Sequence, residues 1–234
     1  DVSKNTALVM LFCNENRLST LDVSKNTELW TLNCSNNQLT TLDVSGKAGL
    51  ARFYCYNNQL TSLNLTNCTS LFDFDCSHNK LTSLVIPEST SSNWISILCV
   101  DTQLTSLDVS RCKALDGLYC DKNQLTSLDV SNNKELVQLS CSENQIKGAA
   151  MSALVNGLRY ASYGDDVFFH VINTESATEQ NVCTRSQATI AFEKNWFVCD
   201  YEFDIQSHIW NPYYGSGITG DVNGDGAVNV ADIG

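Results

Sequence analysis

The final fifteen residues, 220–234, carry the side chains whose types and spacing best suit a chemical task, the binding of a metal ion. Counted from Asp221 as position 1, oxygen-bearing side chains occupy positions 1, 3, 5, 9 and 12, and Gly226 at position 6 suits a sharp turn. The expected ligands are Asp221, Asn223, Asp225, Asn229 and Asp232, together with the backbone carbonyl of Ala227. This is the ligand order of a 12-residue calcium-binding loop. The sequence therefore predicts a Ca²⁺ site, with a solvated Asp/Gly turn as the alternative.

The identity of two of these ligands indicates a particular kind of calcium loop. Asp232 stands where the general calcium loop has Glu, and with Asn229 before it the segment resembles the first calcium loop of a type I dockerin. The resemblance implies calcium binding. For a whole dockerin, which has two such loops, it also implies docking to a cohesin domain of another protein. A cohesin-like partner is thus expected if the dockerin is complete in a longer precursor.

Side chains that could catalyse a reaction are few. Strand alternation places His78 on the same side as Cys76, near a turn, but a buried thiol lacks the access that a nucleophile needs. Asp73 and Asp75 lie two residues apart, about 6.5 Å along a strand. That separation would suit hydrolysis by paired carboxylates, yet such pairs are also common on solvated faces. Without a phosphate loop, a zinc pattern or a triad motif, the sequence predicts that the protein is not an enzyme.

Seven cysteines reveal the repeated elements that must position any site. They recur every 21 residues with one interval of 23, at Cys13, Cys34, Cys55, Cys76, Cys99, Cys120 and Cys141. An asparagine three residues after each cysteine keeps the period, except in the fifth unit, which has Thr102. The unit reads Leu-x-x-Leu-x-Cys-x-x-Asn-x-Leu-Thr-Ser-Leu-Asp-Val-Ser and resembles the leucine-rich repeat family, with Cys where Leu is usual. Seven copies cover residues 1 to about 148.

This resemblance implies a fold class: an α/β, β-rich leucine-rich repeat solenoid. It is a right-handed superhelix with a parallel sheet on its concave face and a C-terminal α/β cap. The alternation Leu, x, Cys suits a strand with one buried face, and one unit cannot bury that face alone. In-register β carbons about 4.8 Å apart do not suit a disulfide, so the repeated cysteines are predicted to be buried free thiols. A bond between Cys183 and Cys199 stays open.

The repeat also sets the domain organisation. The chain divides into a solenoid at 1–148, a capping region at 149–219 and a partial calcium loop at 220–234. A cap is expected because a bare solenoid end exposes core and unpaired backbone. The fifth unit is longer and contains Pro87, so a bulge is predicted over 86–92, either as drift in one repeat or as a specificity loop.

Patterns within the capping region predict two helices and two strands. The helices are expected over 148–159 and 184–195, with Thr184 as the N-cap of the second, and the strands over 166–172 and 196–201. The region is similar to the C-terminal region of secreted bacterial leucine-rich repeat proteins, notably at Asn181, Val182 and Trp196.

Variable residues between the buried positions form columns that would line the concave surface. The candidate ligand-binding residues are the aromatic and charged members of these columns: Phe12, Arg52, Tyr54, Tyr56, Asp73, Asp75, Tyr119 and Asp121. Exposed aromatics beside carboxylates suit a protein, peptide or glycan ligand. Ordinary surface variation is the alternative.

Composition excludes several classes of partner. Lys plus Arg is 14 and Asp plus Glu is 26, a net charge of −12, which argues against binding nucleic acid or an anionic membrane. No apolar run approaches 18 residues, so no transmembrane segment is expected. Asp1 falls within a repeat, which indicates a trimmed piece of a longer precursor.

These observations together predict the function. We expect a non-catalytic recognition module of a secreted or cell-surface bacterial protein, tethered by its calcium-binding tail. Two alternatives stay open: a rigid architectural spacer, and the targeting module of a larger extracellular enzyme, for example a carbohydrate-active one.

Overall fold

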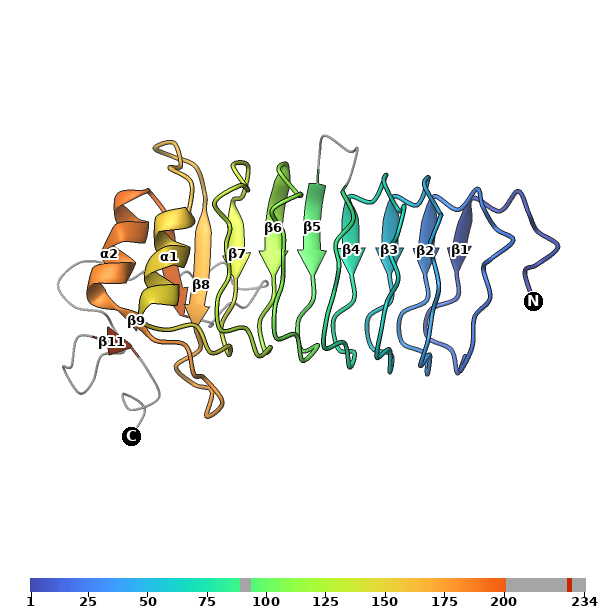
Figure 1. Ribbon diagram of the computed structural model, residues 1–234, viewed down its shortest axis with the longest axis horizontal. Coiled ribbons are helices and arrows are strands. Elements are labelled where there is room, and N and C mark those ends of the chain that lie inside the picture. Colours follow the sequence, from blue (N-terminus) through green and yellow to red (C-terminus); the bar gives the residue numbers. More distant parts are fainter. Residues whose placement is uncertain (89–93, 201–226, 229–234) are drawn as a thin grey trace.

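A row of short parallel strands, one for each repeat, forms the body of the molecule. The structure is a computed structural model, which describes residues 1–88, 94–200 and 227–228. Each repeat makes one turn of a solenoid, and the turns stack along the long axis from the N-terminal end to two helices at the other end (Figure 1). The strands of the seven turns are β1 Met10–Phe12, β2 Thr31–Asn33, β3 Arg52–Tyr54, β4 Asp73–Asp75, β5 Trp94–Leu98, β6 Leu115–Tyr119 and β7 Gln138–Ser140.

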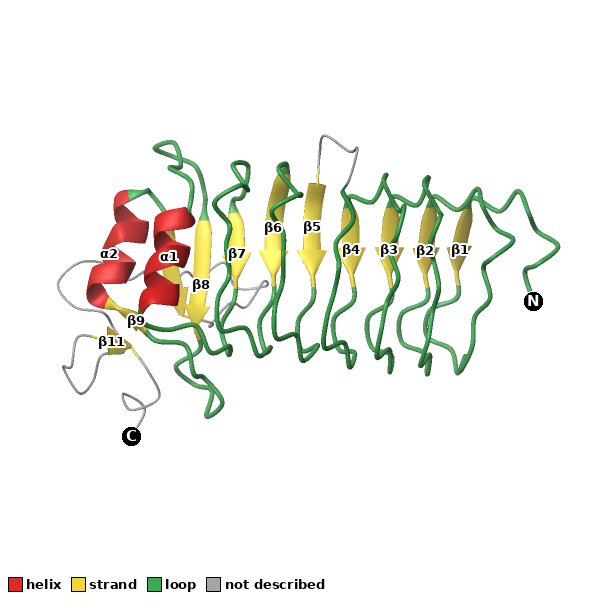
Figure 2. Cartoon of the chain, viewed as in Figure 1, coloured by secondary structure: helices red, strands yellow, loops and turns green. Residues whose placement is uncertain are grey.

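The strands form where the sequence alternates with period two. In β3 the central Phe53 is fully buried, while Arg52 and Tyr54 on either side are half-buried on the outer face. The same register joins every neighbouring pair from β1 to β7, so equivalent residues stand in columns across the sheet. The strands lie side by side along the solenoid (Figure 2), and we call the outer surface of these strands the sheet face. It is therefore a regular array of side chains from successive turns.

The capping region lengthens this sheet. Beyond β7 the strands β8 Phe168–Ile172 and β10 Phe197–Asp200 pair in parallel, giving nine strands in one sheet. Helix α1 Ala149–Gly157 and helix α2 Arg185–Glu193 lie beside this end (Figure 1). Both helices and both strands fall inside the predicted ranges. Short strands β9 Cys183–Thr184 and β11 Ala227–Val228 pair in antiparallel fashion.

The start of α2 follows the predicted chemistry. The Thr184 hydroxyl accepts a hydrogen bond from the Gln187 backbone N–H, and the Gln187 side chain accepts one from the Thr184 backbone N–H. Such a capping box satisfies two N–H groups that a helix start leaves unpaired. The predicted bulge over 86–92 falls largely outside the described residues, but β5 keeps the common register with β4 and β6 on either side.

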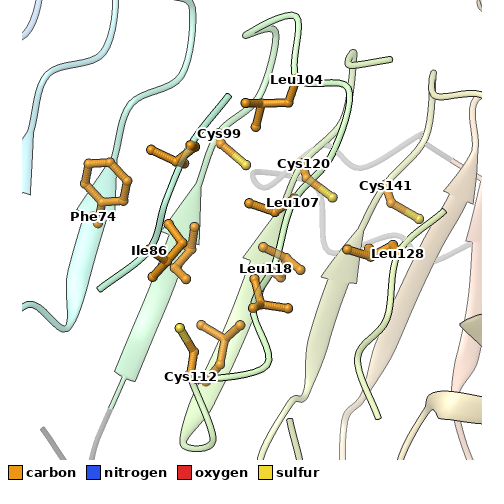
Figure 3. Close-up of a cluster of buried hydrophobic side chains, with 14 of the residues drawn as sticks. Phe74, Ile86, Cys99, Leu104, Leu107, Cys112, Leu118, Cys120, Leu128 and Cys141 are labelled. Carbon is orange, nitrogen blue, oxygen red and sulfur yellow. The ribbon is translucent and has the colours of Figure 1, made fainter. Parts of the chain in front are cut away.

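The repeated cysteines lie inside the solenoid. Six of the seven are fully buried, and Figure 3 shows Cys99, Cys120 and Cys141 beside leucines of both walls. Cys13 on the first turn is half-buried. All eleven cysteines are free, Cys183 and Cys199 included, as predicted for the repeated positions. Burial raises the pKa of the Cys34 thiol to about 12, so these side chains act as small hydrophobic groups.

A ladder of asparagines binds each turn to the one before it. Asn58 is representative: its Nδ2 donates to the carbonyl oxygens of Cys34 and Cys55, both at 3.1 Å, and its Oδ1 accepts from the Leu39 backbone N–H at 2.9 Å. The same pattern of bonds recurs at Asn37, Asn79, Asn123 and Asn144. The asparagine thus satisfies buried backbone groups where the chain leaves the strand, as predicted.

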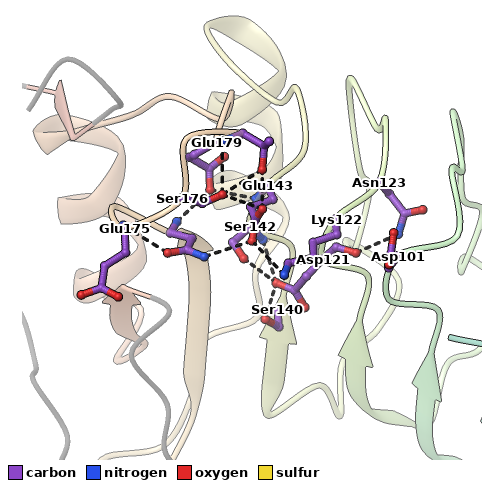
Figure 4. Close-up of polar contacts among 12 residues, drawn as sticks. Asp101, Asp121, Lys122, Asn123, Ser140, Ser142, Glu143, Glu175, Ser176 and Glu179 are labelled. Atoms are coloured by element: carbon purple, nitrogen blue, oxygen red, sulfur yellow. Dashed lines mark hydrogen bonds and ion pairs between the residues drawn. The ribbon is translucent and has the colours of Figure 1, made fainter. Parts of the chain in front are cut away.

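The loop 173–181 covers the last turn and supplies hydrogen bonds that the next repeat would otherwise make. Asn181 takes the place of the next ladder asparagine, because its Oδ1 accepts from Ile146 N–H at 2.7 Å and its Nδ2 donates to the Cys141 carbonyl at 2.8 Å. The buried carboxylate of Glu179 accepts from the backbone N–H of Glu143 at 2.8 Å (Figure 4). In earlier turns the equivalent N–H donates to a carbonyl of the following turn, as the Lys122 N–H does to the Ser142 carbonyl oxygen. Glu179 and Asn181 therefore pair backbone groups of the last turn that in earlier turns are paired by the following repeat.

Candidate binding face

The sheet face carries two columns of side chains that run across all the strands. The first column consists of Met10, Thr31, Arg52, Asp73, Ser96, Gly117, Gln138, Phe168 and Phe197. The second column consists of Phe12, Asn33, Tyr54, Asp75, Leu98, Tyr119, Ser140 and His170. Seven of the eight predicted binding residues are half-buried or exposed, and all but Tyr56 and Asp121 lie in these two columns. The strands thus bring six of the eight predicted residues onto one surface.

A tyrosine and an aspartate from neighbouring strands are joined at the middle of this face. The Tyr54 hydroxyl donates to Asp73 Oδ2 at 2.5 Å, and the Ser96 hydroxyl donates to Asp73 Oδ1 at 3.2 Å. Burial raises the pKa of Tyr54, and the bond to the Asp73 carboxylate raises it further. Both oxygens of Asp73 therefore hold neighbouring side chains, and the Tyr54 ring is fixed in place.

The second aspartate of the pair has a different environment. Asp75 is half-buried, and its Oδ1 accepts from the Ser77 backbone N–H at 2.9 Å. Burial raises the pKa of Asp75, against the lowering effect of its bonds to Ser77. The two carboxylates, Asp73 and Asp75, thus stand two residues apart as predicted, each bonded to its own neighbours.

Two other aromatic candidates differ in their exposure. The Tyr119 hydroxyl donates to Gln138 Oε1 on the next strand, which fixes this ring in the same way as Tyr54. Phe12 on the first strand is 62% exposed, and Tyr56 just beyond β3 is half-buried. The aromatic side chains of the face are therefore a mixture of fixed tyrosines in the middle and an exposed ring at the first strand.

Asp121 does not belong to the exposed face, contrary to prediction. Its side chain is 2% exposed, and its Oδ1 accepts from the Ser140 hydroxyl at 2.6 Å, the Ser142 hydroxyl at 2.7 Å and the Ser142 N–H at 2.9 Å (Figure 4). The small serines of the following turn leave room above Asp121 and supply three donors. Burial raises its pKa, although these bonds act to lower it. Asp121 is thus a structural link between turns.

The prediction that His78 shares a side with Cys76 is also wrong. Cys76 is fully buried, whereas His78 is exposed and its Nδ1 lies 3.3 Å from Asp101 Oδ2. The chain has left the strand at His78, whose φ of 54° is in the left-handed region, so strand alternation no longer applies.

Sequence reasoning missed a third column of residues, which lies at the turns after the strands. One residue per turn has a φ between 52° and 56°, and these residues are Glu15, Asn36, Asn57, His78, Asp101, Lys122 and Glu143. Their side chains interact in pairs: Asn36 with Asn57, His78 with Asp101, and Lys122 with Glu143 at 3.6 Å. A polar cavity of about 400 Å³ borders the last pair. The sequence alone could have identified this column, because each of its residues directly precedes the ladder asparagine of its turn, or Thr102 in the fifth turn.

Sequence reasoning also missed Trp30 and Phe72, which pack against Arg52. The Arg52 guanidinium carbon lies 5.2 Å from the centroid of the Trp30 ring and 5.6 Å from that of the Phe72 ring. Both aromatics stand one residue before a strand, a position outside the two columns. Comparison of that position between turns, rather than of the columns alone, would have found them.

The predicted calcium ligands fall almost entirely outside the described residues. Of that set only Ala227 is described, in β11. In the part of the chain that the structure describes, no three His, Cys, Asp or Glu side chains come together as a metal site would require. Neither described helix has the length and apolar character needed to cross a bilayer.

The stacked parallel strands, the buried leucines and the asparagine ladder define a leucine-rich repeat solenoid, and comparison with solved structures confirms that fold class. No protein-family model and no curated protein matches the chain. The chain is similar to the functional domain of InlJ from Listeria monocytogenes, which includes a cysteine ladder, at 31% identity and a TM-score of 0.57 over 74% of this chain and 37% of that one. It spans little more than a third of that structure's length.

Two further bacterial structures share the fold at lower identity. One is a leucine-rich repeat protein of Leptospira interrogans, with 20% identity and a TM-score of 0.60 over 77% of this chain and 45% of that one. The other is the internalin InlF of Listeria monocytogenes, with 14% identity and a TM-score of 0.52 over 85% of this chain and 62% of that one. The neighbours of this chain are thus bacterial leucine-rich repeat proteins.

Proposed function

We propose that the protein is a non-catalytic recognition module of a secreted or cell-surface bacterial protein, and that its sheet face binds a partner protein. The observation that carries this proposal is the fixed array of side chains at the middle of the face. Tyr54 and Tyr119 are each tied to a neighbouring strand by their hydroxyl groups, so their rings are held before a partner arrives. Rigid aromatic side chains contribute strongly to protein interfaces because little entropy is lost on binding.

The proposed contact residues are the predicted ones without Asp121. They are Phe12, Arg52, Tyr54, Tyr56, Asp73, Asp75 and Tyr119. The similarity to internalin-type structures supports a role in protein interaction. A glycan partner is the second possibility for the same face, since aromatic rings beside carboxylates also suit sugars.

A selection experiment tests the sheet face. A phage-displayed library of random dodecapeptides is selected on the immobilised full chain, and the affinities of enriched peptides are measured for Tyr54→Ala and Tyr119→Ala. Tyr163→Ala is the matched control, because Tyr163 lies in the capping region and is 99% exposed. We expect each face substitution to weaken binding about tenfold or more and the control to leave it unchanged. Peptides that bind all three variants equally would reject the sheet face as the binding surface. Binding only to a glycan array would reject a protein partner.

For the tail, we propose that residues 220–234 bind Ca²⁺ and tether the protein to a cohesin-like domain. The proposed ligands are Asp221, Asn223, Asp225, Ala227, Asn229 and Asp232, whose order suits a calcium loop. Calorimetric titration of Ca²⁺ into the full chain should give one binding event for this loop that Asp225→Ala removes. Absence of calcium-dependent heat, or an event unaffected by Asp225→Ala, would remove the metal assignment.

A further inference from the structure

Arg52 on β3 contacts two aromatic rings, one from the turn before its own and one from the turn after it. The ring centroids of Trp30 and Phe72 are 6.5 Å apart, and the Arg52 guanidinium carbon lies within 5.6 Å of both. The rings come from turns that are not adjacent. They reach one another because the turn between them has Ala51 at this position, a buried side chain too small to separate them. Cation–π contacts with both rings therefore restrict the orientation of the guanidinium.

Among the described residues, the neighbouring acid Asp73 makes no ion pair with Arg52. Asp73 is its direct neighbour in the sheet register, but both oxygens of Asp73 accept hydrogen bonds from the Tyr54 and Ser96 hydroxyls. Among the described residues, no hydrogen bond or ion pair involves the Arg52 guanidinium. Its Nε is buried without a partner, whereas the two terminal nitrogens are not among the buried unpartnered atoms and so reach the surface. An arginine with its donors unpaired in this way is prepared for an external acceptor.

The chemistry of this site selects one class of ligand. A guanidinium presents two parallel N–H donors that match the two oxygens of a carboxylate, and prior stacking means that little freedom is lost on binding. Arg52 is the one arginine or lysine in the two columns of the sheet face. Asp73 and Asp75 stand beside it, and the whole chain carries a net charge of −12, so a repeating polyanion would be repelled.

A single carboxylate among uncharged groups meets less of that repulsion than a polyanion does. Trp30, 41% exposed, offers an aromatic surface for the side chain next to it. From this arrangement we infer that Arg52, with Trp30 and Phe72, forms a binding site for one Asp or Glu carboxylate of a partner protein. The inference rests on the proposed function of the sheet face and names the chemistry of its partner.

The dodecapeptide selection on the full chain tests this inference with two variants of Arg52. Arg52→Gln removes the charge, and Arg52→Lys keeps the charge but removes the flat two-donor geometry. Arg111→Gln, an exposed arginine outside the sheet face, is the matched control. We expect the enriched peptides to share an Asp or Glu. Replacing that residue by Asn or Gln, and replacing Arg52 by Gln, should each weaken binding at least about tenfold. The two changes together should be little worse than either alone, because both remove one contact.

Several results would overturn the assignment. Enriched peptides that carry no shared acid, or that bind Arg52→Gln as tightly as the original chain, would do so. If such peptides still fail to bind Tyr54→Ala or Tyr119→Ala, the sheet face remains a binding surface and the carboxylate site alone is rejected. Enrichment of no peptide would reject both proposals. Binding of polygalacturonate that depends on Arg52, without acidic peptides, would assign the site to a polysaccharide instead. If Arg52→Gln loses its native circular dichroism spectrum, the Arg52→Lys variant provides the test instead. Peptides that bind Arg52→Lys as tightly as the original chain would overturn the inference.

Discussion

Replacing one asparagine of the ladder should destabilise the solenoid far more in the middle than at its first turn. Asn58→Ala removes the acceptor of the buried Leu39 N–H and a longer donation, at 3.4 Å, to the Tyr56 carbonyl. It also removes two donations to the carbonyls of Cys34 and Cys55. Each of those carbonyls keeps one other asparagine donor, from Asn37 or Asn79, so the unpaired Leu39 N–H dominates the loss.

The structure gives both a magnitude and a matched control. An unpaired buried N–H costs about 2 kcal/mol and the weakened carbonyl bonds about 1 kcal/mol more, so Asn58→Ala should lower the free energy of unfolding by about 3 kcal/mol. Asn16 occupies the same position in the first turn, but it is exposed, and its Nδ2 bonds only to carbonyls of its own turn, those of Cys13 and Asn14. Asn16→Ala should therefore cost less than about 1 kcal/mol.

Urea unfolding followed by circular dichroism measures the two free energies, and amide hydrogen exchange by mass spectrometry locates the loss. For Asn58→Ala we expect faster exchange in the peptide that contains Leu39. Equal free-energy losses at Asn16 and Asn58 would refute the reasoning. So would a large loss without faster exchange at Leu39, because the damage would then lie elsewhere.

Three further predictions follow from the same ladder and its end. Thr102→Asn should raise the free energy of unfolding by about 1 kcal/mol. An asparagine at this position would accept a hydrogen bond from the Leu81 N–H, which has no acceptor among the described residues. An unchanged urea midpoint would contradict this. In the native protein a thiol reagent should modify Cys13 fastest, and the fully buried cysteines should react only on unfolding; rapid reaction of several thiols in native buffer would disprove their burial. Burial raises the pKa of Glu179 from 4.5 to about 7, so the folded state binds this proton more tightly, and stability should rise by up to about 3 kcal/mol as the pH falls from 7 to 4.5. Glu179→Gln should lose that part of the pH dependence of the urea midpoint, and an identical pH dependence in both proteins would show that Glu179 stays ionised.

The sequence predicted those features that depend on one periodic pattern. Leucine, cysteine and asparagine recur at fixed positions, and a strand with one buried face has no other register that keeps them inside. The N-cap of α2 was equally predictable, because Thr184 and Gln187 lie within one helical turn and need no information from the rest of the fold.

Features that depend on the size of a neighbour were not predictable from the pattern. Asp121 is in a column of exposed residues, and it is buried because serines 19 and 21 residues later leave space above it. Arg52 stacks on two rings because one small residue, Ala51, stands between them. Glu179 and Asn181 complete the last turn from a loop outside the period, so no count of repeat positions could assign their roles.

The hydrogen bonds of the face decide what a partner can use. The hydroxyl groups of Tyr54 and Tyr119 are bonded within the protein, so the tyrosines offer mainly their ring surfaces. Each oxygen of Asp73 already accepts one internal hydrogen bond. Arg52 is the exception, since its terminal nitrogens have no partner among the described residues. Contacts to rings contribute affinity with little directional preference, whereas a guanidinium requires a carboxylate at one place and angle. On this face the tyrosines would therefore set how tightly a partner binds, and Arg52 would set which partner binds and in which register.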